Sequence, residues 1–99
     1  MQSHIPGIMA APNSSRIKTR ILRAEKSEQY ADKWQLEFEI LESENISGPN
    51  FARVGEKGEG FTFRPAWELP LPVIVEAEAE YIGGPQKGLF QLTNLHLCK

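Results

Sequence analysis

Hydrophobic and polar residues alternate most regularly in the last third of the chain. Glu76, Glu78 and Glu80 fall on one face of residues 73–81, and the other face holds Val73, Val75, Ala77, Ala79 and Tyr81. A period of two is typical of a β-strand with one buried side and one solvated side. The glycine-rich stretch 83–88 follows, and because glycine tolerates positive φ, the chain can reverse there. The pattern therefore predicts a β-hairpin over residues 73–99.

Three earlier segments show the same alternation, at residues 16–24, 34–43 and 58–64. The third is short, places Phe61 and Phe63 on one face, and has flanking glycines that are typical of a bulge or a tight bend. We expect the alternating apolar positions to face the core. In the first two segments these are Ile17, Thr19, Ile21, Trp34, Leu36, Phe38 and Ile40.

The remaining segments are interpreted as a tail and loops. Residues 1–15 lack periodicity and are expected to form a flexible tail, and residues 25–33 and 44–57 are polar or rich in turn residues. Residues 65–72 contain three prolines, so they cannot form a regular helix or a central strand. The apolar side chains in these loops are expected to pack on the core. Phe51 and Val54 are expected to hold the loop 44–57 against it, and the segment 65–72 is expected to cap an open end of the core with Trp67, Leu69 and Leu71.

Five strands with these lengths, spacings and glycines resemble the OB-fold family over about residues 16–98. The resemblance is architectural, and the stretch between the third and fourth strands departs from the version of the fold that has a helix there. It implies an all-β domain at residues 16–99, a five-stranded OB-like closed or partly open barrel, with the flexible tail at 1–15. It also implies that the first strand lies between the second and the fourth. An SH3-like barrel and a small β-sandwich are the alternatives.

The outward charges agree with the OB strand order. The first strand presents Lys18 and Arg20, the second presents Glu37 and Glu39, and the fourth presents the three glutamates of the hairpin. A basic strand between two acidic ones gains roughly 0.2–1 kcal/mol per cross-strand pair, whereas adjacent acidic rows repel. The row of Glu76, Glu78 and Glu80 is therefore interpreted as a solvated strand face with ion-pair partners, and not as an acid–base catalytic site.

The composition of the chain argues against several classes of function. The chain has 99 residues, enough for one domain, and a net charge of −2, which provides no overall basic field for duplex DNA. Cys98 is the sole cysteine, so no internal disulfide or multi-cysteine zinc site can form. Neither an apolar run of membrane-spanning length nor a signal-peptide core is found, and we expect a cytoplasmic protein without membrane association. With no catalytic motif, no cofactor motif and only His96 near Cys98, we expect no enzyme activity, no cofactor and no metal.

The leading hypothesis is a small module that binds single-stranded nucleic acid. OB-folds bind single strands across the second and third strands, using basic side chains along the phosphates and aromatic rings against the bases. We expect Tyr30, Phe51 or Tyr81 to be available for stacking. The competing interpretation places Phe61, Phe63 and Tyr81 in the core and makes the lysines solubilising loop residues. The candidate binding residues are Lys26, Tyr30, Lys33, Arg53, Lys57, Arg64 and Lys87.

The alternative hypothesis is a protein-interaction module or accessory subunit. A barrel with a short third strand leaves an edge that can accept a strand from another chain. Trp67, in its proline-rich segment, is the candidate anchor for a partner protein. Its structural interpretation is a lid over the mouth of the barrel.

Overall fold

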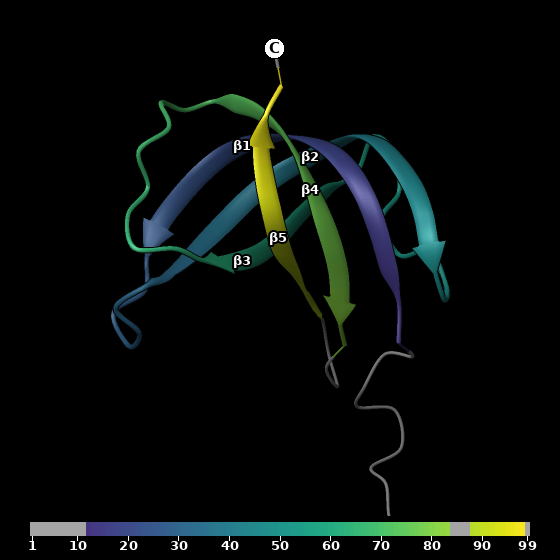
Figure 1. The fold of residues 1–99 in the computed structure, drawn as a ribbon, viewed down its shortest axis with the longest axis horizontal. Helices are drawn as coiled ribbons and strands as arrows, with labels where there is room; N and C mark the ends of the chain where they lie inside the picture. Colours follow the sequence, from purple (N-terminus) through teal and green to yellow (C-terminus); the bar gives the residue numbers. More distant parts are fainter. Residues whose placement is uncertain (1–11, 84–87, 99) are drawn as a thin grey trace, which may run out of the picture.

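The computed structural model describes residues 12–83 and 88–98, and all the regular structure in these residues is β-sheet (Figure 1). This confirms the all-β prediction, and the predicted segments agree with the observed strands except at their ends. The first two strands are longer than predicted, at 13 and 15 residues. The strands are β1 (Ser14–Lys26), β2 (Lys33–Ser47), β3 (Lys57–Phe63), β4 (Val73–Ile82) and β5 (Leu89–Leu97).

The five strands close into a ring in the order β1-β2-β3-β5-β4, which returns to β1. As predicted, β1 lies between β2 and β4, antiparallel to both. The ring is closed by a parallel pairing of β3 with β5, which covers only the pairs Gly60–Phe90 and Phe61–Gln91. The closing junction is thus much shorter than the pairings formed by β1.

The interior of the ring is filled by large side chains from four strands and by small residues from β3. Phe38 of β2 is fully buried, and its ring lies 5.8 Å from that of Phe90, edge to face. A Cβ placed on Gly58 or Gly60 would meet the Phe38 ring at 2.9–3.2 Å. The Phe38 ring therefore occupies space that side chains at these two positions would need. The buried apolar residues are Ile17, Ile21, Leu36, Phe38, Ile40, Ala52, Val75, Ala77, Ala79, Phe90 and Leu92.

The competing interpretation of β3, which placed Phe61 and Phe63 in the core, is wrong. Phe61 and Phe63 do share a face, but it is the outer face, because Gly60 and Thr62 point inward and are buried. Phe63 is 51% exposed, and Phe61 is half-buried. The physical reason is space, since Phe38 and Phe90 already occupy the interior opposite β3.

The chain is anchored to the barrel before β1 begins. The Asn13 side chain donates a hydrogen bond to the carbonyl of Tyr81 (3.0 Å) and accepts one from its amide (2.8 Å). Because β1 starts at Ser14, the predicted tail extends too far at its C-terminal end, and residues 1–11 lie outside the described part of the chain. Residues 84–87 of the predicted turn, which include Lys87, also lie outside the described part of the chain.

Two of the loop predictions need correction. In the loop after β2, Phe51 packs on the core as predicted, but Ala52 is the buried residue beside it, and Val54 is 62% exposed. In the segment between β3 and β4, Trp67 and Leu69 pack on the core, whereas Leu71 is 38% exposed. Residues 64–72 thus cover one end of the barrel, and they arch from the end of β3 to the start of β4 in Figure 1.

The outward charges of β1 pair with β2. The ion pairs join Arg20 to Glu39 (2.8 Å), Arg23 to Glu37 (3.5 Å), Lys18 to Glu42 (3.7 Å) and Arg16 to Glu44 (3.7 Å). This confirms the predicted attraction between the first two strands. Towards β4 the register places Glu76 opposite Lys18 and Glu78 opposite Arg16, yet these two cations take their partners from β2. The predicted ion pairs with the β4 row are therefore not formed in the described residues.

Candidate functional site

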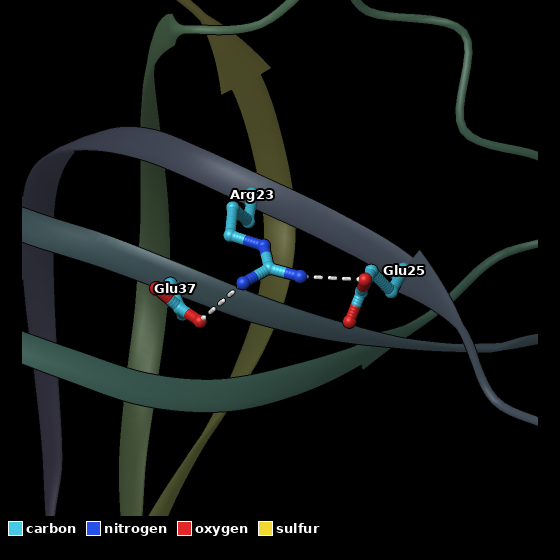
Figure 2. Close-up of polar contacts among 3 residues, drawn as sticks. All are labelled: Arg23, Glu25 and Glu37. Atoms are coloured by element: carbon cyan, nitrogen blue, oxygen red, sulfur yellow. Dashed lines mark hydrogen bonds and ion pairs between the residues drawn. The ribbon is translucent and has the colours of Figure 1, made fainter.

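The cations of the barrel fall into two groups. Those on the outer side of β1 are held in ion pairs, and Arg23 is held twice, by Glu25 at 2.6 Å and by Glu37 at 3.5 Å (Figure 2). Glu25 first, and then Glu37, raise the pKa of Arg23 above its ordinary value through hydrogen bonding and charge. Within the described residues, a second group of cations forms no ion pair with a carboxylate. These are Lys26, Lys33, Arg53, Lys57 and Arg64.

An exposed cluster of aromatic rings lies beside one of these cations. The Lys33 ammonium is 4.6 Å from the centre of the Phe61 ring and 5.2 Å from that of Tyr30. Phe63 packs edge to face on Phe61 at 5.6 Å, and Tyr30 is 54% exposed. Because β2 pairs with β3 from Lys33 opposite Phe63 onward, Phe61 and Phe63 share the outer face of the two strands with Lys33, and Tyr30 lies in the loop just before β2. The ammonium lies over a face of the Phe61 ring, so a positive charge and aromatic rings meet at one place on the surface.

A groove runs over the outer face of β2 and β3. Its first part has a volume of about 250 Å³ and is bounded by Arg23 and Glu25 of β1 on one side and by Leu89 of β5 on the other. Its second part, of about 440 Å³, ends at Leu22 and Lys57. Both parts are lined by Glu37 and Glu59, so they form one surface, which we call the β2–β3 groove. The side chains that line its first part between these limits are Lys33, Gln35, Glu37, Glu59 and Phe61.

The predicted binding residues are only partly brought together. Lys33 and Lys57 line the two parts of the groove, with Tyr30 beside Lys33. Lys26 is exposed at the end of β1, in register with Trp34. The other two described candidates lie elsewhere. Arg53 lines a cavity at the end of the barrel, and Arg64 stacks over Trp67.

Two of the proposed stacking residues are partly buried and pack against the core. Phe51 stacks on Tyr81 at 4.8 Å, and Tyr81 in turn packs edge to face on Phe90 at 5.0 Å. The Tyr81 hydroxyl accepts a hydrogen bond from the amide of Gly88 at 3.1 Å. These rings close one end of the barrel. Tyr81 therefore follows the core interpretation, whereas Phe61 and Phe63 depart from it.

The contacts of Trp67 are those of a lid. Its ring lies 6.3 Å from that of Trp34, its indole N–H donates to the carbonyl of Leu69 at 2.9 Å, and Arg64 stacks on it at 5.4 Å. The N–H of Trp34 donates to the carbonyl of Arg64 at 3.2 Å. Both indoles are thus engaged within the chain, and the partner-binding role of Trp67 stays a prediction.

A stability measurement separates these two roles of Trp67. If Trp67 is a lid, the variant Trp67→Ala loses the packing on Trp34. The free energy of unfolding, measured by urea denaturation, is then expected to fall by about 2 kcal/mol. The matched control is Leu71→Ala, in the same segment but exposed, which should change it by less than about 0.5 kcal/mol. Equal and small effects of both variants would favour a free anchor for a partner.

Other candidate sites contain little that points to chemistry. Within residues 12–83 and 88–98, no three His, Cys, Asp or Glu side chains gather in a position to hold a metal ion. His96 is exposed, and Cys98 is half-buried at the end of β5. In the β4 row, the amide of Asn94 donates a hydrogen bond to Glu78 at 3.2 Å, and Glu76 and Glu80 are exposed.

Sequence reasoning missed several residues that line the groove, among them Arg23, Gln35 and Phe61. A signal for Phe61 was present in the alternation of Gly58, Gly60 and Thr62 with larger residues. Small residues at every second position fit a face that packs against large rings, but without the positions of Phe38 and Phe90 this signal does not decide which face of the strand is buried.

Comparison with family models finds no match to this chain, and comparisons with curated proteins and with solved structures find none either. Among the described residues, no helix has the length and apolar character needed to cross a membrane.

Proposed function

We propose that this protein is a small non-catalytic binding module that holds single-stranded nucleic acid in the β2–β3 groove. The observation that carries the proposal is the outward-facing pair Phe61 and Phe63, of which Phe63 is exposed, with the Lys33 ammonium 4.6 Å from the Phe61 ring centre. Aromatic faces beside an unpaired cation fit the two components of a single strand, since bases stack on rings and phosphates attract lysine.

We further infer that the barrel is an OB-fold. The ring order β1-β2-β3-β5-β4 and the position of β1 between β2 and β4 support this inference. In that fold the ligand lies on the second and third strands, framed by the loop after the first strand. Tyr30 belongs to this loop, and Lys26 and Lys33 flank it. The resemblance and the groove therefore favour the same face.

The charges favour modest affinity. Stacking on an aromatic ring is worth about 1–3 kcal/mol per base. If three of the unpaired cations contact phosphates, the logarithm of the binding constant should fall with the logarithm of salt concentration with a slope of about −2. The net charge of −2 and the groove carboxylates oppose tighter binding.

The test is fluorescence anisotropy of a labelled single-stranded oligonucleotide, titrated with the protein at low salt. We expect saturable binding that weakens with added salt, and about tenfold weaker binding by Phe61→Leu, because leucine keeps the apolar bulk but has no ring face. The matched control is Ile46→Ala, on an exposed part of β2 outside the groove, which should bind as the wild type does.

Either of two results would sink the proposal: no binding at low salt, or binding that Phe61→Leu leaves unchanged. In the salt titration, Lys33→Gln should also make the slope shallower, because one phosphate contact is lost. Lys18→Gln is the control for that measurement, since Lys18 already pairs with Glu42 on β2.

A partner-protein function is the second candidate, and the short β3–β5 junction favours it. Beyond Phe61 and Gln91 the two strands no longer pair, and a slot of about 300 Å³ lies between them. An extended strand of a partner could pair with the free edge of β5. Chemical-shift changes confined to Leu92–Leu95 on adding a partner, with none at Phe61, would favour this function. The slot is lined by Thr62, Phe63, Arg64, Leu92, Thr93, Asn94 and Leu95.

A further inference from the structure

We propose that the β2–β3 groove selects nucleobases that carry an exocyclic amino group, such as cytosine, over thymine and uracil, with Glu37 as the hydrogen-bond acceptor beside the Phe61 ring. The proposal rests on the proposed function and names the ligand class of the same groove. The side chains around the Phe61 ring determine this selectivity. Gln35 lies opposite Phe61 in the β2–β3 register, and Glu37 is the next outward residue on β2.

The register brings these groups within reach of one base. Side chains directly opposite on antiparallel strands have Cβ atoms about 4.5–5.5 Å apart, and diagonal neighbours are about 7–8 Å apart. A base stacked on Phe61 therefore projects its edge towards Gln35 and Glu37, which line the same groove. The Gln35 amide can donate and accept, so it can orient a base without choosing among bases.

The Glu37 carboxylate is held in place, but not all of its hydrogen-bond acceptor positions are used. One of its carboxylate oxygens accepts a long contact from Arg23 at 3.5 Å, and its side chain is 49% exposed. Arg23 is in turn held by Glu25 at 2.6 Å (Figure 2). The anchored guanidinium therefore restrains the position of the Glu37 side chain at the groove. The remaining acceptor positions of the carboxylate are free to meet a ligand.

An ionised carboxylate only accepts hydrogen bonds, and this gives the selectivity. The N4 amino group of cytosine donates at the edge where thymine and uracil present the O4 acceptor. Cytosine thus gains a charge-assisted hydrogen bond, whereas thymine and uracil can donate to Glu37 only through the ring N3–H, which lies between two carbonyl oxygens that repel the carboxylate. Cytosine and thymine have similar ring faces, so stacking on Phe61 does not cancel the difference.

The cations at the two ends of the groove determine how the strand lies. Phosphates are attracted to these ends, where Lys33 and Lys57 lie, and Glu37 turns them away from the middle. The register pairs Lys33–Phe63 and Glu39–Lys57 mark these ends, about 20 Å apart at roughly 3.3 Å per residue. The strand therefore binds with its bases turned into the groove and its backbone passing near Lys33 and Lys57.

The experiment compares homo-oligomers of deoxycytidine, thymidine and deoxyuridine of equal length at one salt concentration, by anisotropy. Wild-type protein is expected to bind the cytosine oligomer about tenfold more tightly than the thymine oligomer. In Glu37→Gln the amide both donates and accepts, so the ratio should fall towards one. Glu42→Gln is the control, because Glu42 lies on the same strand outside the groove and the ratio should persist.

Removing a negative charge also strengthens binding of every oligomer, so the ratio and not the affinity is the readout. Equal or tighter binding of the thymine oligomer by the wild type would overturn the selectivity while leaving the proposed function intact. A ratio that Glu37→Gln does not change would overturn the role of Glu37. If no oligomer binds, the proposed function itself fails, and this inference fails with it.

Discussion

Replacing Phe38 by alanine is expected to lower the free energy of unfolding by about 3–5 kcal/mol. Phe38 is fully buried, packs against Phe90, and fills the space that Gly58 and Gly60 leave in the facing strand. The glycines have no side chains that could move into the cavity, so the loss should lie near the upper end of that range. Urea denaturation followed by the fluorescence of Trp34 and Trp67 measures it.

The control for Phe38→Ala is Phe63→Ala, which removes the same ring from the outer face. Phe63 is 51% exposed and packs only edge to face on Phe61 among the ring contacts of the described residues, so less than about 1 kcal/mol should be lost. Equal losses from the two variants would mean that the assignment of the inner and outer faces of the barrel is wrong.

Replacing Gly60 by alanine is expected to cost about 3 kcal/mol, at the upper end for overpacking a core. A Cβ at Gly60 would overlap the carbonyl oxygen of Phe90, which is backbone and cannot rotate away. Gly60 and Phe90 also form one of the two pairs that close the ring, so the strain falls on the junction of β3 with β5. Denaturation measures the cost, and faster amide exchange in β5 should accompany it.

Gly58→Ala is the matched control for that prediction. It lies two residues earlier in β3, and its Cβ would meet the Phe38 ring at 2.9 Å, a side chain that can adjust. We expect a cost of about 1 kcal/mol. If Gly60→Ala were no more destabilising than Gly58→Ala, the close backbone approach at the junction would be disproved.

The candidate site was predictable in part. Lys33, Lys57 and Tyr30 could be chosen from the sequence because cations and a tyrosine in or beside loops are normally exposed. Phe61 could not, since two phenylalanines at alternate positions favour burial when the strand is considered alone. Its outward position depends on Phe38 and Phe90, which come from other strands and occupy the interior first. The sequence also could not show which cations are free of ion pairs, because the outward cations of β1 pair with glutamates of β2 only once the two strands lie side by side.

The sequence by itself determined the number of strands, their approximate bounds and the buried face of β1, β2 and β4. Alternation of apolar and polar residues is a local property, and it survives whatever the strands pack against. Only the tertiary structure decided which face of β3 is buried, how the ring closes, and that Trp67 lies on Trp34. Each of these depends on the volume that distant segments leave open, and a local pattern contains no measure of that volume.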